Sequence, residues 1–272
     1  MVRDSFDLSN KIALVIGGRG VLGSRFCETF RENGADVYAA DLSSPQTEKQ
    51  QDVNNLSQLD VDVRDAESVS HLVDNVVARA RQIDILVYSV TAKPKDFYAP
   101  FTECSLEGWR FVLQTELDGL FLLTQKVGKV MEEAGHGSII FLSSIYGMVG
   151  NDQRIYEGSN LHEVYLGDEE SSPKRIFSHP VYAAAKGAVI SLTRYLAAYW
   201  GHQNIRVNCI SPGGLAHPGE NAEFVKRYSE RVPMHRKADP DELSGAALFL
   251  ASDASSYVTG HNLVVDGGWT AW

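Results

Sequence analysis

Tyr182 and Lys186 are the two residues of this chain whose types and spacing best suit proton transfer. They stand four positions apart in the stretch YAAAKGAV, so on a helix their side chains lie on one face. An ammonium group beside a phenol favours the ionised form and lowers the pKa of the phenol from about 10 toward neutrality, where it can act as a general acid or base. A lysine that stacks on a surface tyrosine has the same spacing, so the surrounding sequence must decide between the two interpretations.

A glycine-rich segment near the N-terminus indicates a nucleotide site. The apolar run 11–16 is followed by Gly17, Gly20 and Gly23 and by a helical pattern over 21–33. A strand, a tight turn and a helix in this order are typical of a loop that binds the pyrophosphate of a dinucleotide at the N-terminus of the helix. Glycines also serve ordinary turns, so the triplet alone is a weak signal.

The next apolar run, residues 36–41, ends in a carboxylate, Asp41. In dinucleotide-binding units an acidic residue at this distance from the glycine loop accepts hydrogen bonds from ribose hydroxyls. The alternative is an ordinary turn residue at the end of a strand.

These elements belong to a pattern that alternates between strand and helix along the whole chain. Several strands are continuous apolar runs, which is typical of a parallel sheet covered by helices on both faces. The sequence therefore predicts an α/β fold: a Rossmann-like, doubly wound, mostly parallel seven-stranded sheet, formed by residues 1–272 as a single domain. Strands are expected at about 11–16, 36–41, 59–63, 83–89, 138–143, 205–210 and 262–266, and helices near 21–33, 66–81, 105–134, 182–200 and 240–252, with caps at Ser105, Gly135 and Gly201.

Composition narrows the class of protein. The chain has 272 residues, 44% of them hydrophobic, and a formal net charge of −10 without a basic block, so neither nucleic acid nor an anionic membrane is an expected partner. No apolar run is long enough for a membrane span or a signal peptide, and we expect a cytoplasmic protein. Three widely spaced cysteines (Cys27, Cys104, Cys209) and eight histidines without a close ligand pair predict free thiols and no metal site.

Together these features resemble the classical short-chain dehydrogenase/reductase family over essentially the whole chain. In the order of that family, the resemblance rests on the glycine loop, Asp62-Val63, Ser143-Ser144, Tyr182 with Lys186, the stretch NCISPG at 208–213, and the ending from Val258 to Gly268. The resemblance implies that Tyr182 is the general acid/base, that Lys186 lowers its pKa and holds the nicotinamide ribose, and that Ser144 hydrogen-bonds the reacting oxygen.

The resemblance also implies a cofactor and the residues that hold it. NAD is the expected cofactor because Asp41 would repel a 2′-phosphate, and NADP is the alternative because Arg19 could approach that phosphate. The expected cofactor-binding residues are Gly17, Arg19, Gly20, Val21, Leu22, Gly23, Asp41, Leu42, Asp62, Val63, Ser89, Tyr182, Lys186, Pro212, Gly213 and Leu215.

Several positions depart from the family pattern. Ile16 stands where a Thr is common, the middle glycine comes one position early, and residues 88–91 read Tyr-Ser-Val-Thr where the family has Asn-Asn-Ala-Gly. Glu116 takes the position of an Asn that organises a proton-relay water in many relatives. A carboxylate could hold the same water, so we include Glu116 among the catalytic residues; a solvated or salt-bridged helix residue is the alternative. His217 falls where a Thr often contacts the nicotinamide carboxamide, or it is an exposed loop residue.

The separation of Ser144 from Tyr182 is much longer than is usual in the family, and residues 150–179 form an insertion. Because both ends of the insertion are tied to catalytic residues, we expect it to cover the substrate pocket and to contribute to specificity; long loops in compact domains are often functional. An oligomer contact or a mobile surface excursion is the alternative.

The predicted function is reversible interconversion of a secondary alcohol and a ketone. Acids, aromatic residues and His217 after Pro212-Gly213 favour a small polar substrate such as a sugar, polyol or hydroxy acid, and the stretch Ile155-Tyr-Glu-Gly158 is similar to relatives in carbohydrate metabolism. The family resemblance implies a homo-oligomer, either a tetramer or a dimer. Two other functions are open: a catalytically inactive nucleotide-sensing or scaffold protein, and a nicotinamide-using epimerase or dehydratase.

Overall fold

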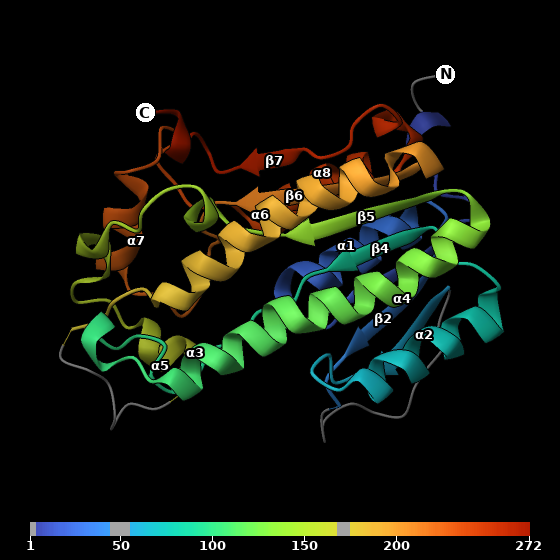
Figure 1. Cartoon of the computed structure of the whole chain (residues 1–272). Coiled ribbons are helices and arrows are strands. Elements are labelled where there is room, and N and C mark those ends of the chain that lie inside the picture. The colour runs from blue at the N-terminus through green and yellow to red at the C-terminus, as the bar shows by residue number, and fades with distance from the viewer. Residues whose placement is uncertain (1–3, 44–54, 168–174) are drawn as a thin grey trace.

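The central element of the computed structural model, which describes residues 4–43, 55–167 and 175–272, is a sheet of seven strands (Figure 1). All neighbouring strands run parallel, in the order β3-β2-β1-β4-β5-β6-β7, so the predicted sheet is confirmed and is parallel throughout. The strands are β1 (Ile12–Ile16), β2 (Asp36–Asp41), β3 (Leu56–Asp60), β4 (Ile85–Tyr88), β5 (Gly137–Leu142), β6 (Ile205–Pro212) and β7 (Asn262–Val265).

Helices cover both faces of this sheet. Figure 1 shows α2 (Ala66–Ala80), α4 (Gly119–Ala134) and α6 (Pro180–Trp200) in front of the sheet, and α1 (Val21–Glu32) and α8 (Ser244–Ala251) behind it. Each layer buries its own apolar core against the strands. Because both faces are covered, β1 and β4 are buried at every position, which explains their continuous apolar sequences.

The predicted strand at 59–63 is wrong by about three residues, because β3 runs over Leu56–Asp60. It is one of the two edge strands of the sheet, and most of its residues are only partly buried. Its sequence LSQLD therefore lacks the apolar run that marks the central strands.

The helix predicted over 105–134 is divided by a π-helical turn. The chain forms α3 (Leu106–Leu113), the turn at Gln114–Asp118 and then α4. The predicted caps are present at both ends: the Ser105 side chain accepts from the Gly108 N–H, and Gly135 takes a left-handed conformation. Single π turns within α-helices often occur at functional sites, and this one carries Glu116.

The described part of the insertion folds against the segment that follows β6. It contains a 3-10 turn (η5, Gln153–Tyr156) and a short helix (α5, Leu161–Leu166), and the later segment forms α7 (Ala222–Ser229). A separate apolar cluster joins them, with members from the insertion, from α7 and from the loop after β4. The insertion is therefore packed into the molecule, although residues 168–174 of it lie outside the described residues.

The remaining helical segments are single turns. They are Asp4–Phe6, Phe101–Glu103, Ile145–Gly147 (η4), Gly201–Gln203, Pro240–Leu243, Asp253–Ser255 and Trp269–Ala271. Gly201 follows α6 as predicted, but it keeps a right-handed conformation, and Asn204 makes the left-handed turn instead.

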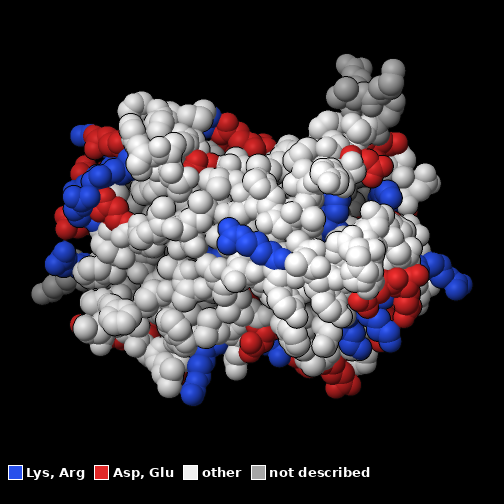
Figure 2. Space-filling view, turned by 45° about the horizontal axis from the view of Figure 1, so that its top comes forward, with Lys and Arg blue, Asp and Glu red and all other residues white. Residues whose placement is uncertain are grey.

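The surface and the described side chains show few specialised features outside the site described below. In the described ranges, no helix has the length and apolarity to span a bilayer, and no cluster of three or more His, Cys, Asp or Glu residues is placed to hold a metal ion. Cys27, Cys104 and Cys209 are free thiols. On the face shown in Figure 2, Lys and Arg alternate with Asp and Glu near the two ends of the molecule, and no continuous basic surface forms there.

Candidate active site

A cavity of about 390 Å³ lies where the carboxyl ends of the strands meet the insertion. In doubly wound folds this edge of the sheet is the usual place for ligands. Its walls come from the loops after β1, β4, β5 and β6, from the first turn of α6, and from the insertion with α7.

The glycine loop forms one end of the cavity. Gly17 has a φ of +77°, and a Cβ there would lie 2.4 Å from the Ser89 carbonyl oxygen, so only glycine fits. A Cβ on Gly23 would lie 2.0 Å from the Gly17 oxygen, which shows how closely α1 approaches the loop. Gly20 precedes α1 without a capping side chain, and Gly20, Val21 and Leu22 line the cavity.

These features fit a dinucleotide. The first N–H groups of α1 point out of the helix end and, with the helix dipole, favour an anion such as a pyrophosphate. The glycines leave room for such a group to approach the backbone. Gly20, Val21 and Leu22 would therefore hold the phosphates of a bound cofactor.

Asp41, at the end of β2, is fixed by the backbone around it. Its carboxylate accepts from the N–H groups of Arg19 and Leu42 at 3.0 and 2.9 Å. The Arg19 guanidinium donates to the carbonyl oxygens of Asp41 and Leu42 and to the Asp60 carboxylate, at 2.8–3.0 Å. Arg19 thus balances part of the negative charge of Asp41 and Asp60, and three contacts hold its partly exposed side chain.

Asp62 and Val63 lie just beyond β3. The Asp62 carboxylate forms a bidentate ion pair with Arg64, at 2.9 and 2.7 Å, and this pair lowers the pKa of Asp62. Val63 is buried and lies against Gly119. A cofactor that contacts Asp62 would meet a carboxylate already engaged by arginine.

The first turn of α6 places Tyr182 in the cavity wall. Pro180 is the first helical residue, and the His179 ring accepts from the Val181 N–H at 3.2 Å, so the helix begins at a defined residue. Tyr182 and Lys186 then follow one turn apart, and both line the cavity. The Lys186 Nζ lies 5.5 Å from the centre of the Tyr182 ring, which is close enough for a cation–π interaction.

Ser144 comes to the same wall from the end of β5. It precedes the turn η4, and its hydroxyl accepts from the Tyr146 N–H at 3.2 Å. Its neighbour Ser143 donates to the Lys186 carbonyl oxygen at 2.8 Å, which ties this loop to α6. The three residues expected to perform the chemistry, Ser144, Tyr182 and Lys186, therefore all line one cavity.

Glu116 lies behind this wall as the direct partner of Lys186. Its Oε2 atom is 2.9 Å from the Lys186 Nζ, and both side chains are at most 5% exposed. Its Oε1 atom accepts from the Thr91 hydroxyl and the Ala92 N–H, at 2.8 and 3.2 Å. Glu116 is thus buried and salt-bridged: of the alternatives to a proton-relay role, the salt-bridged residue is found and the solvated one is not. The π turn directs it inward.

Electrostatic interactions couple the groups in this wall. Burial raises the pKa of Tyr182, Lys186 lowers it, Glu116 raises it, and the hydrogen bond from Ser144 lowers it. The net direction is upward, so the expected fall of this pKa toward neutrality is wrong for the net shift, although Lys186 acts in the expected direction. Burial alone would lower the pKa of Lys186, but Glu116 and Tyr182 raise it above its ordinary value. Lys186 is therefore held as a cation beside the phenol.

The segment after β6 contributes a second buried ion pair to the cavity wall. Lys237 contacts the Glu220 carboxylate, and both side chains are at most 5% exposed. Burial lowers the pKa of Lys237, and Glu220 offsets part of this effect. Tyr165, from α5, donates to Glu220 at 3.3 Å and lies 5.3 Å, centre to centre, from the His217 ring. His217, in the segment after β6, therefore lines the cavity next to the insertion.

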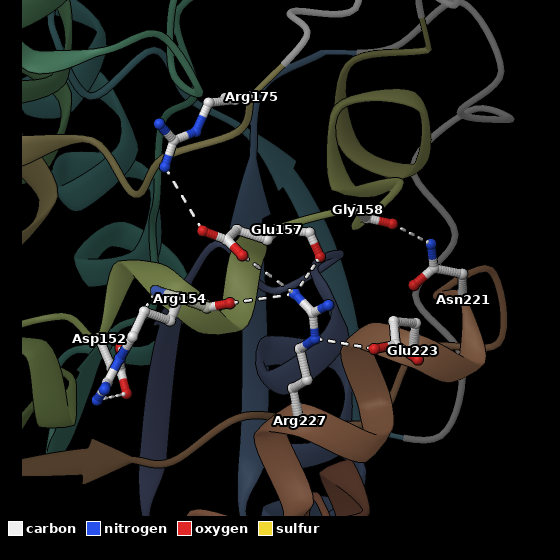
Figure 3. A network of polar contacts seen from close by, with 8 residues as sticks. All are labelled: Asp152, Arg154, Glu157, Gly158, Arg175, Asn221, Glu223 and Arg227. Atoms are coloured by element: carbon white, nitrogen blue, oxygen red, sulfur yellow. Dashed lines mark hydrogen bonds and ion pairs between the residues drawn. The ribbon is translucent and has the colours of Figure 1, made fainter.

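A polar network fastens the insertion to α7 (Figure 3). Arg227 donates to the carbonyl oxygens of Glu157 and Arg154, at 2.6 and 3.3 Å, and also pairs with Glu223 on its own helix. The Asn221 side chain donates to the Gly158 carbonyl at 2.8 Å. Most of these contacts are made to backbone carbonyl oxygens of the insertion, so they fix the path of its backbone against α7.

The structure separates the residues predicted for the cofactor into two groups. Those that line the cavity are Gly20, Val21, Leu22, Ser89, Tyr182, Lys186, Pro212, Gly213 and Leu215. Those that do not line it are Gly17, Arg19, Gly23, Asp41, Leu42, Asp62 and Val63, which shape the loop or lie toward β2 and β3.

The lining residues that were not singled out from the sequence include Lys93, Tyr98, Tyr146 and Lys237. Lys93 follows β4 and Tyr146 follows β5, so the rule that strand carboxyl ends line the crevice could have found both. Lys237 had no such signal.

Comparison with known proteins identifies the family. A model described as short chain dehydrogenase matches residues 11–159, and one described as Enoyl-(Acyl carrier protein) reductase matches residues 164–270. A D-threitol dehydrogenase of Mycolicibacterium smegmatis is 35% identical over 97% of this chain and 95% of its own length. A 2-dehydro-3-deoxy-D-gluconate 5-dehydrogenase of Bacillus subtilis is 33% identical over 98% of both.

Solved structures agree. A short chain dehydrogenase from Leptospira borgpetersenii with bound NAD+ has a TM-score of 0.84 and 31% identity, covering 99% of this chain and 96% of that one. A gluconate 5-dehydrogenase from Burkholderia cenocepacia, in complex with NADP and tartrate, has a TM-score of 0.82 and 27% identity over all of both chains.

The chain belongs to the classical short-chain dehydrogenase/reductase family. It is an NAD(P)-dependent dehydrogenase that acts on CH–OH groups. The relatives named above are described as dehydrogenases, so the comparisons favour an enzyme over the sensor or scaffold alternative.

Proposed function

We propose that this protein is an NAD-dependent dehydrogenase that interconverts a secondary alcohol and a ketone on a small polar substrate such as a sugar, polyol or hydroxy acid. The observation that carries the proposal is the convergence of Ser144, Tyr182 and Lys186 on a single cavity, whose lining also includes the buried ion pair of Lys237 and Glu220.

In this proposal Tyr182 is the general acid/base. During oxidation the ionised Tyr182 removes the hydroxyl proton of the substrate, and during reduction it returns that proton to the developing alkoxide. Ser144 orients the reacting oxygen and donates a hydrogen bond to it as charge develops. A bound nicotinamide supplies the hydride chemistry. Lys186 stabilises the phenolate and, by its position, would also hold the nicotinamide ribose.

We assign Glu116 a positioning role. Its carboxylate fixes the Lys186 ammonium and keeps it charged, because a buried ammonium without a counter-ion would lose its proton more readily. A proton-relay water beside Glu116 stays a prediction. The negative charge of Glu116 also raises the pKa of Tyr182, and the positive charge of Lys186 counteracts this rise.

NAD is the proposed cofactor, in preference to NADP. The Asp41 carboxylate lies at the end of β2 and would repel a 2′-phosphate, whereas it can accept from free ribose hydroxyls. Arg19, the residue that could offset this repulsion, is engaged by Asp60 and two carbonyl groups.

The lining of the cavity supports a polar substrate and a covering role of the insertion. Tyr156, Leu161 and Tyr165 of the insertion line it, together with His217 and residues of α7. Buried polar groups require partners, and a substrate with several hydroxyls provides them.

We also propose a homo-oligomer, a dimer or tetramer. Phe121 on α4 and Tyr195 and Tyr199 on α6 are large hydrophobic residues, each more than half exposed. Exposed apolar groups on neighbouring helices favour self-association. Light scattering coupled to size-exclusion chromatography tests this: a monomer at micromolar concentration would contradict it.

The proposed activity is tested with a panel of sugars, polyols and hydroxy acids, assayed with NAD and NADP separately by the absorbance of the reduced cofactor. We expect stoichiometric NADH with at least one substrate and slower reaction with NADP. Product without net NADH would favour the epimerase or dehydratase alternative, and absence of any reaction across the panel would count against the dehydrogenase.

A further inference from the structure

Three lysines line the cavity, and two of them are neutralised by buried carboxylates. Lys186 pairs with Glu116, and Lys237 pairs with Glu220, with all four side chains at most 5% exposed. The third is Lys93, on the segment after β4. Among the ion pairs formed by the described residues, none includes Lys93. The cavity wall therefore carries one net positive charge that the protein does not balance by contact.

Lys93 is held in place at the substrate side. Its Nζ lies 4.6 Å from the centre of the Tyr165 ring, so the insertion supplies a cation–π contact. The hydroxyl of the same Tyr165 donates to Glu220, which connects Lys93 to the buried pair of Glu220 and Lys237. The side chain is thus oriented by a defined partner on the insertion, far along the chain from its own loop.

The surroundings of Lys93 make a ligand anion favourable there. Burial lowers the pKa of Lys93, Glu116 raises it in part, and Lys186 lowers it further. A partly desolvated cation without a counter-ion gains from a carboxylate that enters with the ligand, because a charge-assisted hydrogen bond then replaces lost hydration. One carboxylate balances one lysine, whereas a phosphate dianion would leave an excess negative charge beside the buried Glu220.

We propose that Lys93 binds a carboxylate of the substrate, and that the natural substrate is accordingly a hydroxy acid and its keto form, with a neutral polyol bound more weakly. This inference rests on the proposed function, because it places the reacting carbinol at Tyr182 and Ser144 in the same cavity. It narrows the class of polar substrate from three kinds to one.

Binding of matched ligands tests the proposal without turnover. Isothermal titration calorimetry of the enzyme saturated with NADH compares threonate with threitol and gluconate with glucitol, each acid with the alditol of the same carbon skeleton. We expect each acid that binds to do so more tightly than its alditol. Lys93→Gln is expected to weaken acid binding by about 10- to 100-fold, the range of a hydrogen bond to a charged group, and to leave the alditols unchanged.

Two further variants control for the fold and for general charge. Lys93→Arg keeps the cation and is expected to retain a preference for acids. Lys95→Gln removes the charge of an exposed lysine two positions away that does not line the cavity, and it is expected to change nothing. The affinity for NADH is expected to be equal in all four proteins.

The outcomes separate this inference from the proposed activity. Equal or weaker binding of the acids by the wild type, or binding of neither acid, would overturn the role of Lys93, even if alditols are oxidised with NAD. Equal loss of acid and alditol binding in Lys93→Gln, or loss of NADH binding, would also overturn it. Acid binding that depends on Lys93 in an enzyme that oxidises no alcohol would support the carboxylate site and contradict the proposed function.

Discussion

The two sides of the cavity are built from different parts of the chain. On the cofactor side, backbone geometry dominates: Gly17 and Gly23 leave no room for a Cβ, and the N-terminus of α1 offers N–H groups. On the substrate side, charged and aromatic side chains dominate, and they come from the loop after β4, the insertion and the segment with α7. Backbone geometry leaves a mark in sequence spacing, whereas contacts between distant side chains do not.

Tyr182 lies where the two sides meet, so its replacement is expected to have the largest effect. Tyr182→Phe removes the proton donor and acceptor, and general acid/base catalysis of this kind contributes about 10²- to 10⁴-fold. We expect kcat to fall by that factor while the affinity for NADH, measured by fluorescence titration, is retained. Tyr257→Phe, at a fully exposed position that does not line the cavity, is the control. Normal turnover by Tyr182→Phe would reject its assignment.

Gly23→Ala is expected to disrupt the cofactor side of the cavity. The added Cβ would lie 2.0 Å from the Gly17 carbonyl oxygen, so the loop or α1 must shift. Overpacking of this kind costs about 1–3 kcal/mol, and we expect weaker NADH binding by about 10- to 100-fold and a lower midpoint of thermal unfolding. Gly245→Ala, in α8, is the matched control because a Cβ there meets no atom within 4 Å. Unchanged NADH affinity in Gly23→Ala would contradict the assignment of this loop to the cofactor.

Arg227→Met is expected to weaken the attachment of the insertion to α7 on the substrate side of the cavity. This change removes the two hydrogen bonds to the backbone of the insertion and the pair with Glu223. Because such partly exposed contacts contribute little individually, we expect the KM for the alcohol to rise several-fold with kcat and NADH affinity nearly unchanged. Lys226→Met, the exposed neighbouring position, is the control. A loss of NADH affinity equal to the change in KM would show that the two sides are not separable.

The same contrast explains what the sequence could and could not predict. The central strands were predicted to within a few residues because burial on both faces produces apolar runs, as in β1 and β4. Ser144, Tyr182 and Lys186 were placed together because strand ends and one helix turn fix their positions. The π turn at Gln114–Asp118 was not predicted, because helical periodicity does not reveal one added residue. For the same reason, the specific contact between Glu116 and Lys186 was not predicted.

Long-range pairs could not be predicted at all. Lys237 and Glu220 carry no motif, and nothing in the local sequence indicates that they meet in a cavity wall. The family stretch 208–213 is partly structural: the Asn208 side chain donates to the Val258 carbonyl and accepts from the His261 N–H, which joins β6 to the loop before β7. Part of this family motif therefore serves to hold the fold together, and it gives no information about the residues on the substrate side.

The pH dependence of alcohol oxidation tests most directly the claim that Lys186 makes Tyr182 a base. Oxidation requires the ionised phenol, and Lys186 lowers the pKa of Tyr182. The double variant Lys186→Met/Glu116→Gln removes the ammonium without leaving a buried carboxylate unpaired. In this variant the rise of kcat with pH is predicted to move to higher pH. In Glu116→Gln alone it is predicted to move to lower pH. If the midpoint of the rise of kcat with pH is the same in both variants and in the wild-type enzyme, the role assigned to Lys186 is contradicted.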